Sequence, residues 1–162
     1  MLSEATLREA FSHFPQGVVL VAAEIDGAPH ALIASTFTVG VSLDPPLVSL
    51  AVQHTSQTWP LLRDRPRLGV SLLGRGQSSI TRQLASTDRR SRFAGLDITT
   101  DEDGAITLRS APARMTTSFH DQMPAGDHDL TLLEVRSIES VPGADAMVFH
   151  RSTFRGLGDL DG

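Results

Sequence analysis

The hydrophobic residues of this chain fall mostly in short runs, but the first pattern is helical. Four apolar residues recur at i, i+3, i+4 and i+7: Leu7, Ala10, Phe11 and Phe14. This spacing puts their side chains on one face of a helix over residues 3–14. Ser3 suits its N-cap and Pro15 its end. The pattern predicts an amphipathic helix whose stripe packs on the body or on a partner subunit.

The later runs are shorter and β-branched, which is typical of strands. Residues 17–25 form an apolar run, Asp26-Gly27 is a hairpin signal, and residues 29–37 return as a second strand. Further strands are predicted over 47–52, 68–73, 115–119, 130–141, 147–149 and 153–154. Short helices are predicted over 61–65 and 77–85, and residues 97–110 are expected to be exposed, acidic turns with one short strand. Short strands separated by turns indicate a closed barrel or a sandwich.

Composition narrows the function classes. The 162 residues carry a net charge of −5, which weighs against nucleic-acid binding. All 14 basic residues are Arg, and the absence of Cys excludes disulfides, thiolate nucleophiles and zinc-thiolate sites. The six His show no helical metal spacing, so no metal site is predicted. There is no signal-peptide pattern and no membrane-length apolar run, so we expect a cytoplasmic protein without a membrane partner.

One stretch between the second and third predicted strands combines small and hydroxyl side chains. Residues 34–38 read Ala-Ser-Thr-Phe-Thr, and residues 42–48 read Ser-Leu-Asp-Pro-Pro-Leu-Val. Small side chains let backbone N–H groups approach a flat ring closely, and hydroxyls can bond ring heteroatoms. Taken alone, the stretch favours an ordinary strand that ends in a Pro-Pro turn.

Taken in order, these residues resemble the flavin reductase-like family, whose FMN-binding split barrel places this segment beside the isoalloxazine ring. The resemblance implies a mainly β fold, namely a six-stranded antiparallel Greek-key split β-barrel with a few short flanking helices. It runs from Phe14 to Phe154, and we expect a single domain over 1–162 with a core of about 11–157. One difference is an extra residue in Val39-Gly40-Val41, which predicts a β-bulge that Gly40 can accommodate.

A polar turn over residues 53–58 follows the third predicted strand. Hydroxyls and N–H groups that lead into a helix N-terminus can bind an anion. By the resemblance, Thr55, Ser56 and Thr58 hold the flavin phosphate, with Gln53 and His54 near the ribityl chain. The alternative is that Ser56 or Thr58 only caps the helix. Some relatives have a Lys here, and the arginines that could replace it are Arg89, Arg90 and Arg92, unless their loop is simply solvated.

Two later motifs also match the family. Gly126-Asp127-His128 resembles a turn near the nicotinamide pocket, where His128 would position the ring without acid or base chemistry. The alternative is a structural His128 paired with Asp127 or Asp129. Residues 148–154 resemble the closing strands, with Phe154 at the pocket mouth. The predicted flavin-binding set is Ala34, Ser35, Thr36, Phe37, Asp44, Gln53, His54, Thr55, Ser56, Thr58, Arg92, Phe93 and Phe154.

The resemblance implies NAD(P)H-dependent reduction of FMN or FAD by hydride transfer from NADH or NADPH. It also implies a homodimer that supplies reduced flavin to a separate monooxygenase. Two alternatives remain open: a flavin-binding carrier without turnover, and another FMN-dependent oxidoreductase on the same barrel. The sequence does not distinguish FMN from FAD.

Overall fold

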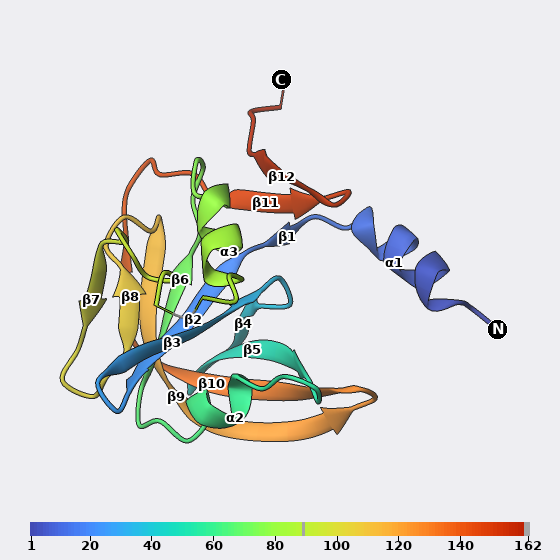
Figure 1. Cartoon of the computed structure of the whole chain (residues 1–162). Coiled ribbons are helices and arrows are strands. Elements are labelled where there is room, and N and C mark those ends of the chain that lie inside the picture. The colour runs from blue at the N-terminus through green and yellow to red at the C-terminus, as the bar shows by residue number, and fades with distance from the viewer. Residues whose placement is uncertain (89, 161–162) are drawn as a thin grey trace.

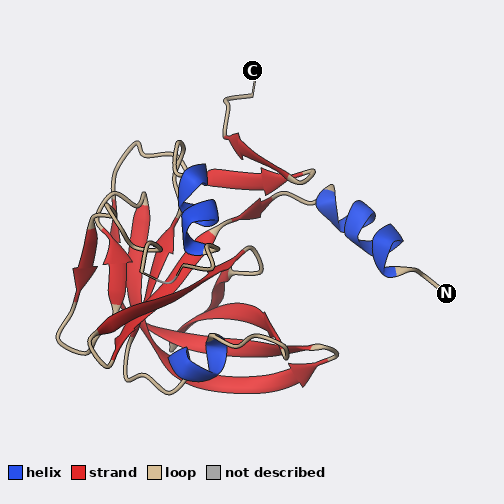
Figure 2. Ribbon diagram, in the orientation of Figure 1, coloured by secondary structure: helices blue, strands red, loops and turns tan. Residues whose placement is uncertain are grey.

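A computed structural model describes residues 1–88 and 90–160. Its body is a seven-stranded antiparallel sheet in the order β3-β2-β6-β9-β10-β5-β4, which curls around a core (Figures 1 and 2). The strands are β2 (Val19–Ile25), β3 (Ala28–Ala34), β4 (Thr38–Leu43), β5 (Pro46–Gln53), β6 (Leu68–Leu72), β9 (Ala113–Ala125) and β10 (His128–Ser140). The long β9–β10 hairpin reaches out to the 126–127 turn, which lies beside the end of β5 (Figure 1).

Two smaller sheets complete the strands. The first has the order β1-β11-β12 and the second pairs β7 with β8. Their bounds are β1 (Gln16–Gly17), β11 (Met147–His150), β12 (Thr153–Gly156), β7 (Ile98–Thr100) and β8 (Ile106–Leu108). The mainly β, antiparallel class is confirmed, but the described residues contain twelve strands rather than six. The extra strands include β1, β7 and β8, of two or three residues each, which are too short to show a period, and the short strands β4, β11 and β12.

Strand β2 is buried on both faces, which explains its uninterrupted apolar run. Alternate side chains of a strand point to opposite faces of the sheet. Val19 and Val21 therefore join a core cluster with residues of β5, β6, β9 and β10. Leu20 and Ala22 join a second cluster that includes residues of β8, β11 and helix α3. The two clusters share β2 as their common wall.

Helices α2 (Trp59–Leu62) and α3 (Ser78–Leu84) cover these cores. Ile80 and Leu84 of α3 are buried, as their spacing predicts. Helix α2 begins two residues before the predicted range of 61–65. Pro60 is suited to the first turn of a helix, and buried Trp59 and Leu62 anchor that turn to the core.

The expectation that residues 97–110 are exposed is wrong for β8. Its three residues are buried, and Leu108 N donates to Ser71 Oγ at 2.9 Å. Strand β8 crosses so close to β6 that a Cβ at Gly69 would overlap the carbonyl group of Ile106. Because the acidic turn at 101–103 dominates the local sequence, the short Ile106-Thr107-Leu108 segment after it is easily overlooked.

Helix α1 (Glu4–Ser12) extends away from the body and buries none of its residues (Figure 1). Its N-cap is the predicted one, because Ser3 Oγ accepts a hydrogen bond from Thr6 N at 3.1 Å. Phe11 and Phe14 remain 64% and 68% exposed. Of the described helices, none has the length and apolar character needed to cross a membrane.

Candidate functional site

The predicted ring-binding stretch lies where the chain passes from β3 to β4. Strand β3 ends at Ala34, three residues before the predicted end at 37. Thr36 instead bonds sideways to β5: its Oγ1 donates to Ala51 O at 2.8 Å and accepts from Ala51 N at 3.3 Å. This side-chain bond fixes Ser35 and Thr36 beside the last residues of β5.

The predicted bulge is present in β4. The register between β4 and β5 shifts between Thr38 and Ser42, and Gly40 has a φ of +73°. An extra residue in one strand of an antiparallel pair produces such a shift, and glycine adopts positive φ without strain. The inserted residue therefore lies in the strand itself and leaves the end of β5 undisturbed.

The polar turn after β5 meets the tip of the β9–β10 hairpin. His54 N donates to Asp127 O at 2.9 Å, and Gln53 pairs with His128 in the β5–β10 register. Ser56 Oγ accepts from Trp59 N at 3.2 Å, so its hydroxyl serves the helix start, as the capping alternative supposed. Thr58 makes no side-chain capping bond. Sequence-distant residues 36, 53–58 and 127–128 thus meet at one end of β5.

A chain of hydrogen bonds connects His54 to the core through Asp129 and Gln122. His54 Nε2 lies 3.0 Å from Asp129 Oδ1, and Gln122 Nε2 donates to Asp129 Oδ2 at 3.0 Å. Gln122 Oε1 in turn accepts from Trp59 Nε1 and Thr131 Oγ1, both at 3.2 Å. Sequence reasoning missed Gln122, which no motif marks. The sequence indicated Asp129 only as a possible partner of His128, but Asp129 pairs with His54 instead.

His128 forms the pair that the structural alternative supposed. Its Nδ1 lies 2.6 Å from Asp127 Oδ1. The hydrogen bond and the charge of His128 lower the pKa of Asp127 from its ordinary value of 3.8. Because this contact engages Nδ1, the other ring nitrogen, Nε2, is the one available to a ligand. The His128 side chain is 30% exposed.

A pocket of about 400 Å³ opens beside this region, between β3, the start of α2 and the loop after α3. Three residues of the predicted set line it: Thr58, Arg92 and Phe93. Residues that sequence reasoning missed line it as well, notably His30 and Gln57. Their neighbours in the sequence, a strand run and a polar turn, suggest no binding role, and only the fold brings them together.

The loop that carries Arg92 and Phe93 is held by helix α3. Gln83 Nε2 donates to Ser91 O at 3.1 Å and to Ala94 O at 2.7 Å. Arg92 Nε donates to Ser86 O at 2.7 Å. Helix α3 therefore holds the part of the loop around Arg92, whereas Arg90 is exposed, as the solvated alternative supposed. Of the three arginines considered, Arg90 and Arg92 line the pocket, and Arg89 lies outside the described residues.

Two predicted residues lie elsewhere. Asp44 is exposed in the turn before β5, and seven strand residues of ~3.3 Å each separate that turn from Gln53. Phe154 lies on β12, with its ring centroid 5.2 Å from that of Phe149. Phe37 follows Thr36 beside β5, but it packs against the first core cluster.

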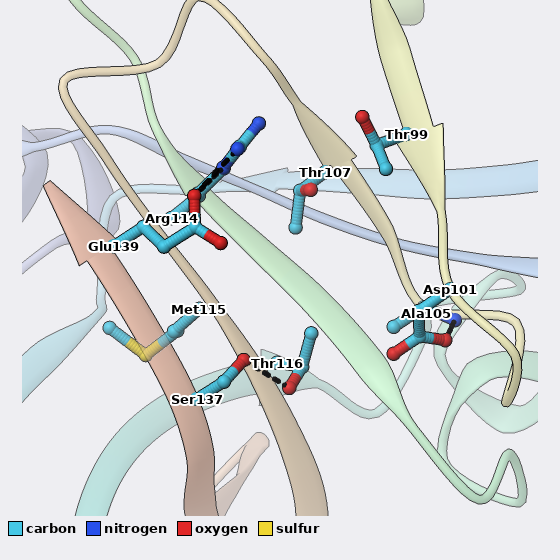
Figure 3. Close-up of a pocket in the computed structure, with 9 residues that line it drawn as sticks. All are labelled: Thr99, Asp101, Ala105, Thr107, Arg114, Met115, Thr116, Ser137 and Glu139. Atoms are coloured by element: carbon cyan, nitrogen blue, oxygen red, sulfur yellow. Dashed lines mark hydrogen bonds and ion pairs between the residues drawn. The ribbon is translucent and has the colours of Figure 1, made fainter. Parts of the chain in front are cut away.

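A second hollow of about 210 Å³ lies between the β7–β8 hairpin and strands β9 and β10 (Figure 3). Four of its polar side chains bind one another in pairs. Arg114 Nη2 donates to Glu139 Oε2 at 2.6 Å, and the hydroxyls of Thr116 and Ser137 are 2.7 Å apart. It contains none of the predicted site residues.

The residue types at the end of β5 match the chemical groups of a flavin nucleotide. Small residues and a fixed hydroxyl occupy one end, a polar turn follows, and the pocket beyond holds two guanidinium groups and a phenyl ring. Arginine suits phosphate, and an aromatic face suits a planar ring. A flavin, when bound, would supply the redox chemistry, while the protein would supply binding and orientation.

Comparisons with known proteins agree with this chemistry. The flavin reductase like domain model matches residues 11–158. The chain is 33% identical to the actinorhodin polyketide dimerase of Streptomyces coelicolor over 83% of this chain and 76% of that relative. It is 29% identical to the reductase component of 4-hydroxyphenylacetate 3-monooxygenase of Thermus thermophilus, over 93% of this chain and 94% of the relative.

A solved structure shows the same fold. It is the NADH:FAD oxidoreductase SgcE6 of Streptomyces globisporus C-1027, in complex with NAD and FAD fragments. It superposes with a TM-score of 0.90 at 30% identity and covers 99% of this chain and 96% of its own. The match of the family model over most of the chain, together with this fold, shows that the chain belongs to the flavin reductase-like domain family.

Proposed function

We propose that this protein is an NAD(P)H:flavin oxidoreductase that transfers a hydride from NADH or NADPH to FMN or FAD. The observation that carries the proposal is the meeting of three predicted segments at one end of β5: Thr36 at Ala51, the turn over 53–58, and Asp127-His128. These segments bear the flavin and nicotinamide contacts that the family resemblance implies.

The roles of the protein's own residues follow from this arrangement. Ser35 and Thr36 would line the ring slot, and Thr55 and Thr58 with the turn N–H groups would hold the phosphate. His128, steadied by Asp127, would orient the nicotinamide carboxamide through Nε2. Holding the two rings in reactive contact is the main contribution that the protein must make.

Anaerobic binding followed by turnover tests the proposal. Purified protein is titrated with FMN and FAD and then mixed with NADH or NADPH, and oxidation of the nicotinamide is followed by its absorbance. We expect oxidation that depends on added flavin. Tight flavin binding with no oxidation would favour a flavin carrier instead, and no flavin binding at all would contradict the proposal.

Ser35→Trp tests the placement of the ring. The larger side chain would fill the slot, so flavin binding should be lost while the circular dichroism spectrum stays that of the wild type. Exposed Ser140→Trp at the end of β10 is the matched control. Wild-type flavin affinity in the Ser35 variant would place the ring elsewhere.

A second candidate function is that of an oxidoreductase that keeps its flavin and acts on another substrate. The 33% identity to a polyketide dimerase favours it. A colourless preparation that consumes free flavin as substrate would support the reductase, whereas a preparation that stays yellow through dialysis would support the second function.

We also infer a homodimer that works in the cytoplasm beside a separate monooxygenase. Helix α1 buries nothing within the chain, and its exposed Phe11 and Phe14 would pack on a second copy. Sedimentation of the wild type should give a dimer, and Phe11→Ser with Phe14→Ser should give a folded monomer. If the wild type sediments as a monomer, the inference of a homodimer is wrong. If the flavin that this protein reduces does not support turnover of an added flavin-dependent monooxygenase, the inference of a monooxygenase partner is wrong.

A further inference from the structure

The larger pocket lies beyond the segment that would hold the flavin phosphate. Gln57 and Thr58 line its near side. The first residues of β3, 28–31, also line the pocket, whereas the ring slot at Ser35-Thr36 follows the other end of that strand. Along the site the order is therefore ring slot, phosphate turn, pocket. A ligand that ends at the first phosphate, as FMN does, would leave this pocket unfilled.

One wall of the pocket is an aromatic ring with a rigid backing. Phe93 is half-buried and packs against the second core cluster on one side, while it lines the pocket on the other. The two hydrogen bonds from Gln83 fix the loop on both sides of Phe93. A ring that is held in this way offers a preformed stacking surface for a planar base.

The pocket also carries positive charge. Arg90 and Arg92 line it, and none of its described lining residues has a carboxylate side chain. The nearby Asp88 carboxylate is engaged, because its Oδ1 accepts from Arg90 N at 3.0 Å. Guanidinium groups next to an aromatic face match a phosphate joined to a nucleoside.

We propose that this pocket binds the adenosine monophosphate half of FAD and makes FAD the preferred flavin of this enzyme. The inference rests on the proposed function, because it assumes that the flavin ring and first phosphate lie at the end of β5. The base stacks on Phe93, and Arg90 and Arg92 contact the second phosphate.

Titration calorimetry with FAD, FMN and AMP tests the inference. FAD should bind at least tenfold more tightly than FMN. AMP should bind to protein that is already saturated with FMN, and it should compete with FAD. Equal affinities for FAD and FMN, or failure of AMP to bind beside FMN, would overturn the assignment.

Substitutions of pocket residues test which side chains bind the adenosine monophosphate half of FAD. Arg92→Gln and Phe93→Leu should each reduce the ratio of FAD to FMN affinity at least fivefold. Leucine keeps the apolar packing of Phe93 on the core but removes the flat face, so a folding defect is avoided, and thermal unfolding checks this. Arg109→Gln makes the same change of charge outside the pocket and should leave the ratio at its wild-type value.

The remaining outcomes distinguish FAD from NADH as the nucleotide whose adenosine phosphate occupies the pocket. A rise in the KM for NADH with an unchanged FAD to FMN ratio would assign the pocket to the nicotinamide nucleotide and overturn the inference. Equal losses of FAD and FMN affinity would place the shared flavin ring in the pocket and also overturn it. Absence of binding by any flavin would instead refute the proposed function itself.

Discussion

Two hollows of this protein each contain arginine and threonine, but they differ in how their polar side chains are engaged. Between β8, β9 and β10, Arg114 is bound to Glu139, and Thr116 to Ser137, although Arg114 Nη1 stays buried without a partner in the described part of the chain. In the pocket beside β3, Arg90 has no side-chain hydrogen bond within the described residues, and Arg92 uses only Nε. Groups that satisfy one another hold a fold together, whereas groups that remain free can bind a ligand.

The strongest test of this contrast is Gly69→Ala, in the β6 strand that pairs with Thr116 of the first hollow. The new Cβ would overlap the Ile106 carbonyl, and a backbone cannot move aside as a flexible side chain can. We expect a loss of about 3 kcal/mol in the free energy of unfolding, at the upper end of overpacking costs. Chemical denaturation measures it.

Gly158→Ala is the control for this substitution, because a Cβ at that position meets nothing within 4 Å. Its unfolding free energy should equal that of the wild type. If Gly69→Ala proves equally stable, the close approach of β8 is not essential to the fold.

Gln122→Ala sharpens the contrast, because the Gln122 network lies near the candidate site but is satisfied internally. The change removes the acceptor of both Trp59 Nε1 and the fully buried Thr131 hydroxyl. Leaving such groups unpaired costs about 1–3 kcal/mol, so thermal unfolding should show a clear loss of stability. If flavin affinity falls more than tenfold while stability is unchanged, the network belongs to the binding site.

Glu139→Gln should have a smaller effect. Glu139 is 69% exposed, so its ion pair with Arg114 is weakened by water and contributes about 0.2–1 kcal/mol. Denaturation should show this small loss, and flavin titration should show none. A weaker flavin affinity would mean that the first hollow takes part in binding after all.

The smallest effect concerns pH. The pKa of Asp127 is lowered by His128, so the pair contributes stability above the ordinary carboxyl value of 3.8 and loses it as the pH falls through the lowered value. NMR titration of the Asp127 carboxyl should therefore give a midpoint below 3.8, and His128→Ala should restore it toward 3.8. An unchanged midpoint in that variant would assign the shift to another group.

The sequence predicted the fold class and most strands because β-branched runs and turn residues repeat clearly. It also predicted the bulge at Gly40 and the cap at Ser3, since each depends on a local rule. It could not predict which distant residues meet. His30 and Gln57 join the pocket only through the packing of β3 against the start of α2, and Gln122 reaches Asp129 only across a hairpin. Asp44 was assigned to the site from its position in a motif, but strand length places it at the opposite end of β5.

Strand β2 has a consequence for how this molecule opens. Alternate side chains of β2 belong to two separate core clusters. If one cluster loses its packing, β2 is uncovered on that face and its residues in the other cluster lose support. The two cores therefore behave as one cooperative unit, and partial opening is confined to elements outside them. Helix α1, with no buried residue, can fray while the polar end of β5 keeps its shape.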